Sequence, residues 1–171
     1  MKKVLLISGG MDSGLLYLRS PKKFDKFVFF RYGQESVGVE ASKVKELVKG
    51  EVTTIKILQE LQMTESNFYY ARNLKMCLGV CDTVGEDLVI YFGTCADDEF
   101  PDNNRRFFRN LAKVLRASYP FKIKILTPLA KTHKKEIYAE YKSLTEVVPT
   151  WCEKGTNCGE CHSCKAMKGL V

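Results

Sequence analysis

The sequence predicts an α/β protein built on an open parallel β-sheet of about five strands with helices on both faces. Short apolar runs alternate with segments whose apolar residues recur at helical spacing, along nearly the whole chain. Uninterrupted apolar runs are typical of strands that are covered on both faces. The 171 residues contain no internal repeat or long linker, so we expect a single domain over residues 1–171.

The elements are expected in a regular order. The strands are predicted at residues 2–7, 27–30, 52–58, 88–92 and 123–126. The helices are predicted at residues 12–18, 39–48, 71–84, 107–115 and 132–141, the first with Asp12 or Ser13 available as its N-cap. Ligands of such sheets bind beyond the carboxyl ends of the strands. The rim of the active site is therefore expected at residues 8–10, 31–34, 93–95 and 127–128.

Composition and charge narrow the class of protein. A hydrophobic content of 45% is ordinary for a soluble globular protein. No apolar run approaches the roughly 20 residues that span a bilayer, and the first residues lack a signal-peptide pattern, so a cytoplasmic protein is expected. The net charge of +7 suits an anionic partner, either a nucleotide or RNA, and does not choose between them.

The first predicted strand runs into the sequence Ser8-Gly9-Gly10-Met11-Asp12-Ser13. Two glycines between a strand and a helix let a ligand approach the main chain, and the free amides at the helix start attract phosphate. Ser8 and Ser13 add hydroxyl donors. The stretch has neither the lysine of a P-loop nor the Gly-x-Gly-x-x-Gly pattern of dinucleotide-binding folds. It resembles the pyrophosphate loop (PP-loop) of enzymes that split ATP into AMP and pyrophosphate.

A cluster of cysteines lies near the end of the chain. Its members are Cys152, Cys158, Cys161 and Cys164. This spacing can supply four sulfurs to one tetrahedral zinc ion. An iron–sulfur centre uses the same ligands, and His162 could replace one sulfur. Four protein ligands leave no open coordination position, so we expect segment 150–171 to hold a structural zinc and to depend on it for folding.

Taken together, these features resemble the 7-cyano-7-deazaguanine synthase family. Smaller matches follow in the same order along nearly the whole chain, namely Tyr32-Gly33-Gln34 with Glu40, Ala71-Arg72-Asn73, Asp97 with Phe100-Pro101-Asp102, Pro128-Leu129 with Lys134 and Glu136, and Thr150-Trp151-Cys152. The chain departs from the family where Phe100 replaces a tyrosine and where Asn103-Asn104-Arg105 replaces Cys-Arg. The resemblance implies a PP-loop fold of the adenine nucleotide α-hydrolase type.

The resemblance also implies an ATP-dependent carbon–nitrogen ligase of the 7-deazaguanine (queuosine-type) pathway. Such an enzyme adenylates 7-carboxy-7-deazaguanine, joins ammonia to form the amide, and dehydrates the amide to 7-cyano-7-deazaguanine, with Mg²⁺ assisting ATP. No stable nucleic-acid binding or membrane association is expected, and a homodimer is compatible with the resemblance. A variant that stops at 7-amido-7-deazaguanine, a tRNA sulfur transferase-like PP-loop enzyme and an inactive nucleotide-binding module are the alternatives.

The resemblance assigns roles to individual residues. Catalytic roles fall on Asp12, Ser13, Arg72 and Lys134. ATP binding is expected from Ser8, Gly9, Gly10, Met11, Asp12, Ser13, Tyr32 and Gln34. The deazaguanine substrate is expected to contact Asn73, Asp97, Phe100, Asp102 and Arg105, and the four cysteines of the cluster are the expected zinc ligands.

Overall fold

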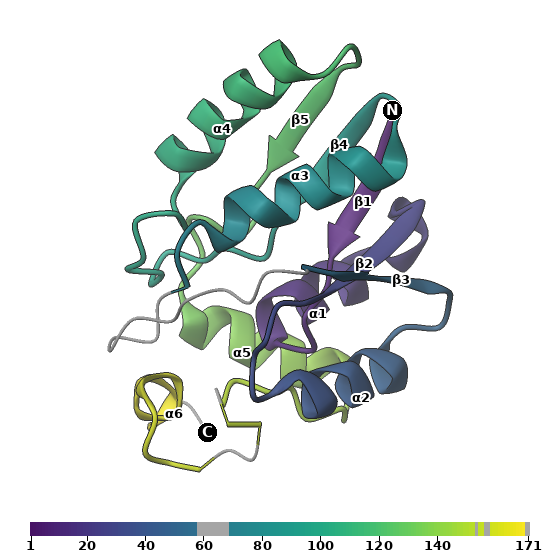
Figure 1. Ribbon diagram of the computed structural model, residues 1–171. Coiled ribbons are helices and arrows are strands. Elements are labelled where there is room, and N and C mark those ends of the chain that lie inside the picture. Colours follow the sequence, from purple (N-terminus) through teal and green to yellow (C-terminus); the bar gives the residue numbers. More distant parts are fainter. Residues whose placement is uncertain (58–68, 153, 156–157, 170–171) are drawn as a thin grey trace.

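Five parallel strands form the centre of the protein (Figure 1), seen in a computed structural model that describes residues 1–57, 69–152, 154–155 and 158–169. The strand order is β3-β2-β1-β4-β5. The strands are β1 (Lys2–Leu6), β2 (Lys26–Arg31), β3 (Val52–Lys56), β4 (Leu88–Tyr91) and β5 (Ile123–Leu126). The chain winds outward from β1 to β3 and then crosses back to β4, on the other side of β1. The loops that leave β1 and β4 therefore part at a topological switch point, where ligands of such folds bind.

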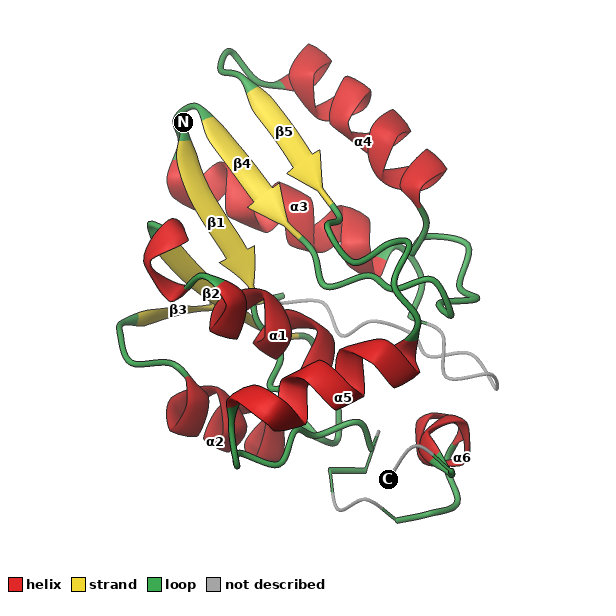
Figure 2. Cartoon of the chain, turned by 180° about the vertical axis from the view of Figure 1, so that it is seen from behind, coloured by secondary structure: helices red, strands yellow, loops and turns green. Residues whose placement is uncertain are grey.

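Helices cover both faces of the sheet (Figures 1 and 2). One face carries α1 (Met11–Arg19), α2 (Val37–Leu47) and α5 (Lys134–Leu144), and the other carries α3 (Arg72–Val84) and α4 (Arg105–Ser118). Side chains of β1 alternate between two hydrophobic cores, because Leu5 packs with α1 and α5 whereas Val4 and Leu6 pack with α3 and α4. The expected parallel sheet with helices on both faces is confirmed.

Element boundaries differ from the sequence expectations in a few places. The short 3₁₀ helix η1 (Pro21–Lys23) and helix α6 (His162–Met167) were not expected. Helix α4 begins at Arg105, because the Asn104 side chain caps it by accepting a hydrogen bond from the Phe107 amide at 2.9 Å. Residue 58, predicted to end the third strand, lies outside the described residues. Among those that are described, no helix is both long and apolar enough to cross a membrane.

The expectation that Asp12 or Ser13 caps helix α1 is wrong. Gly10 occupies the N-cap position, and no side chain accepts a capping hydrogen bond there. The first helical bond runs from the Gly14 amide to the Gly10 carbonyl at 3.1 Å. The amides of residues 11–13 precede this bond, so the helix itself offers them no carbonyl. This helix start is therefore suited to an external acceptor.

Candidate active site

A cavity of about 320 Å³ lies where the loops after β1 and β4 part. Most of the predicted ligand-binding residues line it, namely Ser8, Gly10, Met11, Asp12, Ser13, Tyr32, Arg72, Asn73, Phe100 and Lys134. They come from the ends of β1 and β2, the starts of α1, α3 and α5, and the loop before α4. Segments far apart in the sequence therefore converge at the switch point. Of the expected rim, residues 127–128 do not line the cavity.

The loop after β1 is held in shape by its own serine side chains. The Ser8 amide lies 3.2 Å from the Ser13 hydroxyl oxygen, and the two hydroxyl oxygens lie 3.3 Å apart. The Ser13 hydroxyl also lies 3.4 Å from the Gly10 carbonyl. These contacts fold the loop over the start of α1. Its amides and hydroxyls form a concave donor surface of the kind that binds phosphate.

Two glycines let other backbone segments come close to this loop. Gly9 has a φ of +75°, and a Cβ there would lie 2.7 Å from the Glu40 carbonyl oxygen. Gly93, which follows β4, passes so near helix α1 that a Cβ would lie 2.6 Å from the Ser13 amide nitrogen. Any larger residue at Gly93 would push the two strand ends apart. The glycines therefore fix the narrow junction between β1 and β4.

Asp12 carries the most perturbed carboxyl group of the cavity. Burial, followed by the nearby charge of Asp98, raises the pKa of Asp12 to about 7, against a lowering by Lys134. Its Oδ1 atom is buried and has no hydrogen-bond partner among the described residues. Burial also raises the pKa of Asp98, which lines the same cavity. Two carboxyl groups that both resist ionisation form a site where a cation would be stabilised.

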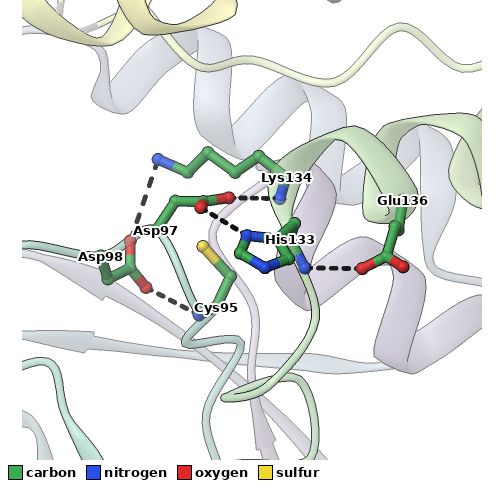
Figure 3. A network of polar contacts seen from close by, with 6 residues as sticks. All are labelled: Cys95, Asp97, Asp98, His133, Lys134 and Glu136. Atoms are coloured by element: carbon green, nitrogen blue, oxygen red, sulfur yellow. Dashed lines mark hydrogen bonds and ion pairs between the residues drawn. The ribbon is translucent and has the colours of Figure 1, made fainter.

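The start of helix α5 is fastened to the loop after β4 (Figure 3). The Asp97 carboxylate accepts hydrogen bonds from the Lys134 amide at 2.6 Å and contacts His133 Nδ1 at 2.8 Å. These bonds lower the pKa of Asp97, and the same contact raises the pKa of His133. Lys134 Nζ lies 3.9 Å from Asp98 Oδ1, and both residues line the cavity. Asp97 thus orients the backbone that carries the Lys134 ammonium group.

The turn after β2 is held by a buried glutamine. Gln34 accepts a hydrogen bond from the Tyr32 amide at 2.8 Å and donates to the Phe30 carbonyl at 2.9 Å. Its Nε2 also donates to Glu40 at 3.0 Å. Gln34 does not line the cavity, whereas Tyr32 and Glu40 do. The glutamine therefore shapes the cavity wall through its neighbours.

Helix α3 delivers Arg72 to the same cavity. Residue Ala71, just before the helix, has a φ of +54°, a conformation that is uncommon for any residue except glycine. Arg72 forms a hydrogen bond with the Tyr32 side chain, whose pKa burial raises to about 12. The Arg72 charge also lowers the pKa of the nearby carboxyl groups of Glu40 and Asp98, opposing the effect of burial. The guanidinium group is thus the second cation of the cavity, beside Lys134.

Asn73 ties helix α3 to the loop before α4. Its amide lies 3.3 Å from Asp102 Oδ2, and its side chain donates to the Asp102 carbonyl at 2.8 Å. Asp102 is 5% exposed and does not line the cavity, whereas Phe100 and Asn103 of the same loop do. Arg105 is exposed at the start of α4 and lies outside the cavity.

Thr94 falls within the rim expected from the sequence, but no sequence pattern assigned a role to it or to several other residues of this cavity. Thr94 and Thr150 are 3% and 8% exposed, and each has a buried hydroxyl without a hydrogen-bond partner among the described residues. Both threonines line the cavity, as do Asp98, Trp151 and Met167. The only sequence signal for Thr94 and Asp98 is their place just after a predicted strand. Thr150 precedes the cysteine cluster, and nothing local indicates that it reaches the loop after β1.

The four cysteines of the cluster converge, and their sulfur atoms all lie within 4.8 Å of one another. Each of three sulfurs lies near a backbone amide, with Cys158 N 3.3 Å from the Cys152 sulfur and Cys164 N 3.4 Å from the Cys161 sulfur. A zinc ion with bonds of about 2.3 Å requires sulfurs about 3.8 Å apart, and the Cys152 and Cys161 sulfurs lie 4.0 Å apart. The cluster could therefore hold one metal ion. The His162 side chain lies outside what the structure describes.

The cysteine segment also forms part of the cavity wall. The Thr150 amide donates to the Gly9 carbonyl at 3.0 Å, and Cys152 follows two residues later. On the far side of the cluster, Ser163 and Met167 of α6 line the cavity. Trp151 packs edge-on against Tyr138 of α5, with ring centroids 6.5 Å apart. The cysteine segment is thus in direct contact with the loop after β1.

Sequence comparisons with known proteins point to one family. The family model for queuosine biosynthesis protein QueC matches residues 62–169. The 7-cyano-7-deazaguanine synthase of Methanopyrus kandleri is 26% identical, in a match that covers 94% of this chain and 90% of that protein. The protein of the same name from Pyrococcus horikoshii is 23% identical, with coverages of 98% and 92%.

A solved structure from Methanocaldococcus jannaschii, described as a predicted subunit of tRNA methyltransferase, matches with a TM-score of 0.46. It is 17% identical and covers 83% of this chain and 75% of its own. A likeness of that degree carries no argument about function. The family model, by contrast, spans well over half of the sequence, including the start of helix α3 and all four cysteines. The chain belongs to the QueC family.

Proposed function

We propose that the protein is an ATP-dependent ligase that converts 7-carboxy-7-deazaguanine to 7-cyano-7-deazaguanine with ammonia as the nitrogen source. The observation that carries the proposal is the cavity that joins the PP-loop to Arg72 and Lys134. Relatives that carry the name 7-cyano-7-deazaguanine synthase match nearly the whole length of the chain. The cavity thus suits chemistry on a phosphate ester, and the names of the relatives supply the substrate.

The chemical problem is that a carboxylate oxygen is a poor leaving group. Attack of this oxygen on the α-phosphorus of ATP releases pyrophosphate and forms an acyl adenylate. Ammonia then attacks the carbonyl carbon, and AMP and a proton depart to leave the amide. A second ATP adenylates the amide oxygen, and loss of AMP and a proton gives the nitrile. Each adenylation moves negative charge onto the departing pyrophosphate, so the site must neutralise that charge.

The residues of the cavity supply this neutralisation. The amides at the start of α1 and the hydroxyls of Ser8 and Ser13 face the same space as the Arg72 and Lys134 cations. Donors that are already oriented stabilise developing charge without rearrangement. The long separation between Lys134 and Asp98, 3.9 Å, leaves the ammonium group available to a phosphate oxygen. We assign Lys134 and Arg72 to the charge of the phosphates.

The carboxyl groups of Asp12 and Asp98 fit a Mg²⁺ ion. Carboxylate oxygens are the ligands that Mg²⁺ prefers, and the unpartnered Asp12 Oδ1 is a free acceptor at the phosphate loop. Without a cation, these two groups would repel the phosphates of ATP. When bound, Mg²⁺ would offset the negative charge of the phosphates, while Asp12 and Asp98 orient it.

Part of the cavity lining is apolar and suits a flat heterocycle. Val28, Phe30, Met76 and Phe92 line it, together with Phe100 of the loop before α4. Aromatic and aliphatic side chains pack well against ring faces. Asn103 adds polar atoms at the same wall. Asp97 and Asp102, which the sequence suggested for the substrate, hydrogen bond to protein backbone instead, so we assign the ring-edge contacts to Asn103 and Thr94.

We propose that the cysteine cluster holds one structural zinc ion. Sulfurs within 4.8 Å of one another suit a single ion, because an iron–sulfur cluster spreads its four thiolates over two or more iron atoms and holds some of the sulfurs farther apart. All four ligands come from the protein, so the ion would have no open position for catalysis. Its role would be to hold Thr150 and α6 against the cavity.

The test is an incubation of the purified protein with ATP, Mg²⁺, ammonium and 7-carboxy-7-deazaguanine, followed by mass spectrometry. A nitrile product with two AMP for each product supports the proposal. Accumulation of the amide with one AMP would limit the activity to the first step. The matched control is Lys45→Glu, an exposed residue of α2 outside the cavity, which should retain full activity. Absence of both AMP and product from wild-type protein that binds ATP would overturn the proposal.

A further inference from the structure

Positive charge is concentrated in one part of the chain. Residues 103–135 contain ten Lys and Arg residues and no Asp or Glu. Because the whole chain carries +7, the remainder has a net negative formal charge. Three of the ten, including Lys134, lie near the cavity and the start of α5. Five others belong to helix α4, which the proposed ligase chemistry does not use.

The five cations of α4 share one side of the helix. With 3.6 residues per turn, they fall within an arc of about 100° around the helix axis. We call this set the basic stripe, and it consists of Arg105, Arg106, Arg109, Lys113 and Arg116, all exposed. The opposite arc carries Phe108, Leu111 and Leu115, which are buried against the sheet. The stripe extends about 17 Å along the helix at about 1.5 Å per residue.

The basic stripe lies at an open edge of the protein. Helix α4 and the edge strand β5 form the outer boundary in both views (Figures 1 and 2). No ion pair among the described residues involves the stripe. Arg116 reaches the strand by donating to the Ile123 carbonyl at 3.4 Å, and Lys122 and Lys124 add exposed cations beside it. The positive charge there is not neutralised by the described part of the chain.

We propose that the basic stripe docks the phosphate backbone of a nucleic acid. A row of cations along about 17 Å fits a chain of regularly spaced phosphates. Four of the five are arginines, whose planar guanidinium groups bind phosphate through two hydrogen bonds. A helix that inserts into a membrane surface presents apolar side chains beside its cations. The one large exposed hydrophobic residue of α4, Val114, lies outside the arc of the stripe.

The basic stripe lies next to the cavity but does not overlap it. Helix α4 begins directly after the loop whose residues Phe100 and Asn103 line the cavity. A nucleic acid on the stripe would therefore run from the mouth of the cavity along the side of the molecule. The small substrate proposed above does not reach the stripe. The docking surface is thus additional to the ligase activity and does not depend on it.

The test is fluorescence anisotropy with a labelled single-stranded RNA of mixed sequence, across about 50 to 200 mM NaCl. If five phosphates are neutralised, the logarithm of the binding constant should fall with log salt at a slope of about −3.5, from about 0.7 per phosphate. A labelled DNA duplex measured in parallel shows which phosphate backbone is preferred, and salt-dependent binding of either supports the proposal. Absence of binding to both at low salt overturns it.

Two double charge-reversal variants distinguish the effect of the basic stripe from the effect of the protein's net charge. Arg109→Glu with Lys113→Glu should weaken binding about tenfold or more and reduce the slope by about 1.4. Lys45→Glu with Lys49→Glu changes net charge by the same amount on exposed residues near α2, and should retain wild-type binding. Equal losses in both variants would overturn the proposal. ATP-dependent AMP formation should be unchanged in both, which confirms that each variant is folded.

Discussion

Two parts of the cavity wall are held together in different ways. The loop after β1, which we propose binds phosphate and call the phosphate loop, is continuous with β1, whose Val4 and Leu5 are fully buried, and its Ser8 and Ser13 hydroxyl groups contact each other at 3.3 Å. The cysteine segment has little regular structure besides α6, and its chain is gathered around four sulfurs. One wall is therefore held by hydrophobic packing, and we propose that the other is held by metal ligation.

In a small protein, a bound metal can replace the stabilisation that hydrophobic packing provides elsewhere. A segment that buries few apolar side chains gains too little from the hydrophobic effect to offset its loss of conformational entropy. Ligation of one ion by four thiolates, as we propose, would supply the missing free energy. The hydrogen bond from Thr150 to Gly9 joins the two walls. Because of this bond, the metal should affect nucleotide binding without touching the nucleotide.

The largest expected effect comes from Asp12→Asn in the phosphate loop. This change removes the carboxylate that we assign to Mg²⁺ and should lower AMP formation on the order of 10³-fold. The side chain keeps its size, so the fold should persist. Measurement of AMP release by chromatography tests the first expectation, and circular dichroism tests the second. AMP release within tenfold of wild type would remove Asp12 from the mechanism.

The same substitution should change how the stability of the protein depends on pH. The pKa of Asp12 is raised to about 7 in the folded protein, whereas the unfolded chain has an ordinary value of about 3.9. The protonated Asp12 carboxyl group therefore makes its full contribution to the stability of the fold below the unfolded pKa. This contribution is lost as the pH rises through about 7. Asp12→Asn should match wild type near pH 4 and melt at a higher temperature at pH 8, without ligand. An equal difference at both pH values would contradict this assignment.

A smaller effect is expected from Cys161→Ala in the other wall. Loss of one ligand should lower the metal content measured by mass spectrometry. ATP affinity, measured by calorimetry, should fall about tenfold, because Thr150 and α6 are no longer held against the phosphate loop. Far-ultraviolet circular dichroism should change little, since the sheet does not involve this segment.

The control for that variant is Cys95→Ala. Cys95 is buried after β4 and lies outside the cluster, so its loss should leave the metal content unchanged. By reciprocity, saturating ATP should also raise the affinity of the wild-type protein for the metal, measured at equilibrium by competition with a chelator. Full metal content in Cys161→Ala would contradict the four-cysteine site. If the metal-free protein bound ATP with unchanged affinity, the metal site would have no influence on nucleotide binding.

Asp97→Ala should have a moderate effect on the first wall. It removes the acceptor for the Lys134 amide and for His133, and should lower ATP affinity about fivefold because the Lys134 ammonium group loses its orientation. Asp97→Asn keeps one oxygen and should lose less. In both variants the raised pKa of His133 should fall toward its ordinary value, as measured by NMR. An unchanged His133 titration would contradict the contact itself.

Most of the sheet could be predicted because its signals are local. Runs such as residues 88–92 are apolar without alternation, which is what burial on both faces requires. The loop after β1 could be singled out as a candidate phosphate site for a similar reason, since its glycines and serines are adjacent in sequence. The cap of α1 was not predicted correctly, because Asp12 has the chemistry of a capping residue but faces the cavity instead.

The remainder of the site depends on tertiary contacts that no local pattern encodes. Gln34 and Asp102 have the polar character of ligand-binding residues, yet both bind protein backbone. Asp98, beside Asp97 in the sequence, is the acid that lines the cavity. Thr150 donates a hydrogen bond to the Gly9 carbonyl, although more than one hundred residues separate the two in the sequence. Polar residues after a strand indicate a rim, but not which of them face a ligand.

The smallest expected effect concerns Thr150→Val, which tests the contact between the walls at a single atom. Valine has the shape of threonine, so the backbone bond to Gly9 remains while the unpartnered hydroxyl is lost. ATP affinity should fall about three- to tenfold if that hydroxyl binds the ligand. Unfolding temperature without ligand should stay equal or rise, because a buried unsatisfied group is removed. Thr83→Val is the control, since the Thr83 hydroxyl donates to the Gly79 carbonyl on α3, away from the cavity. If Thr150→Val bound ATP with wild-type affinity, the Thr150 hydroxyl would not contact the ligand. The cysteine segment would then contribute to ATP binding only through its backbone and the metal.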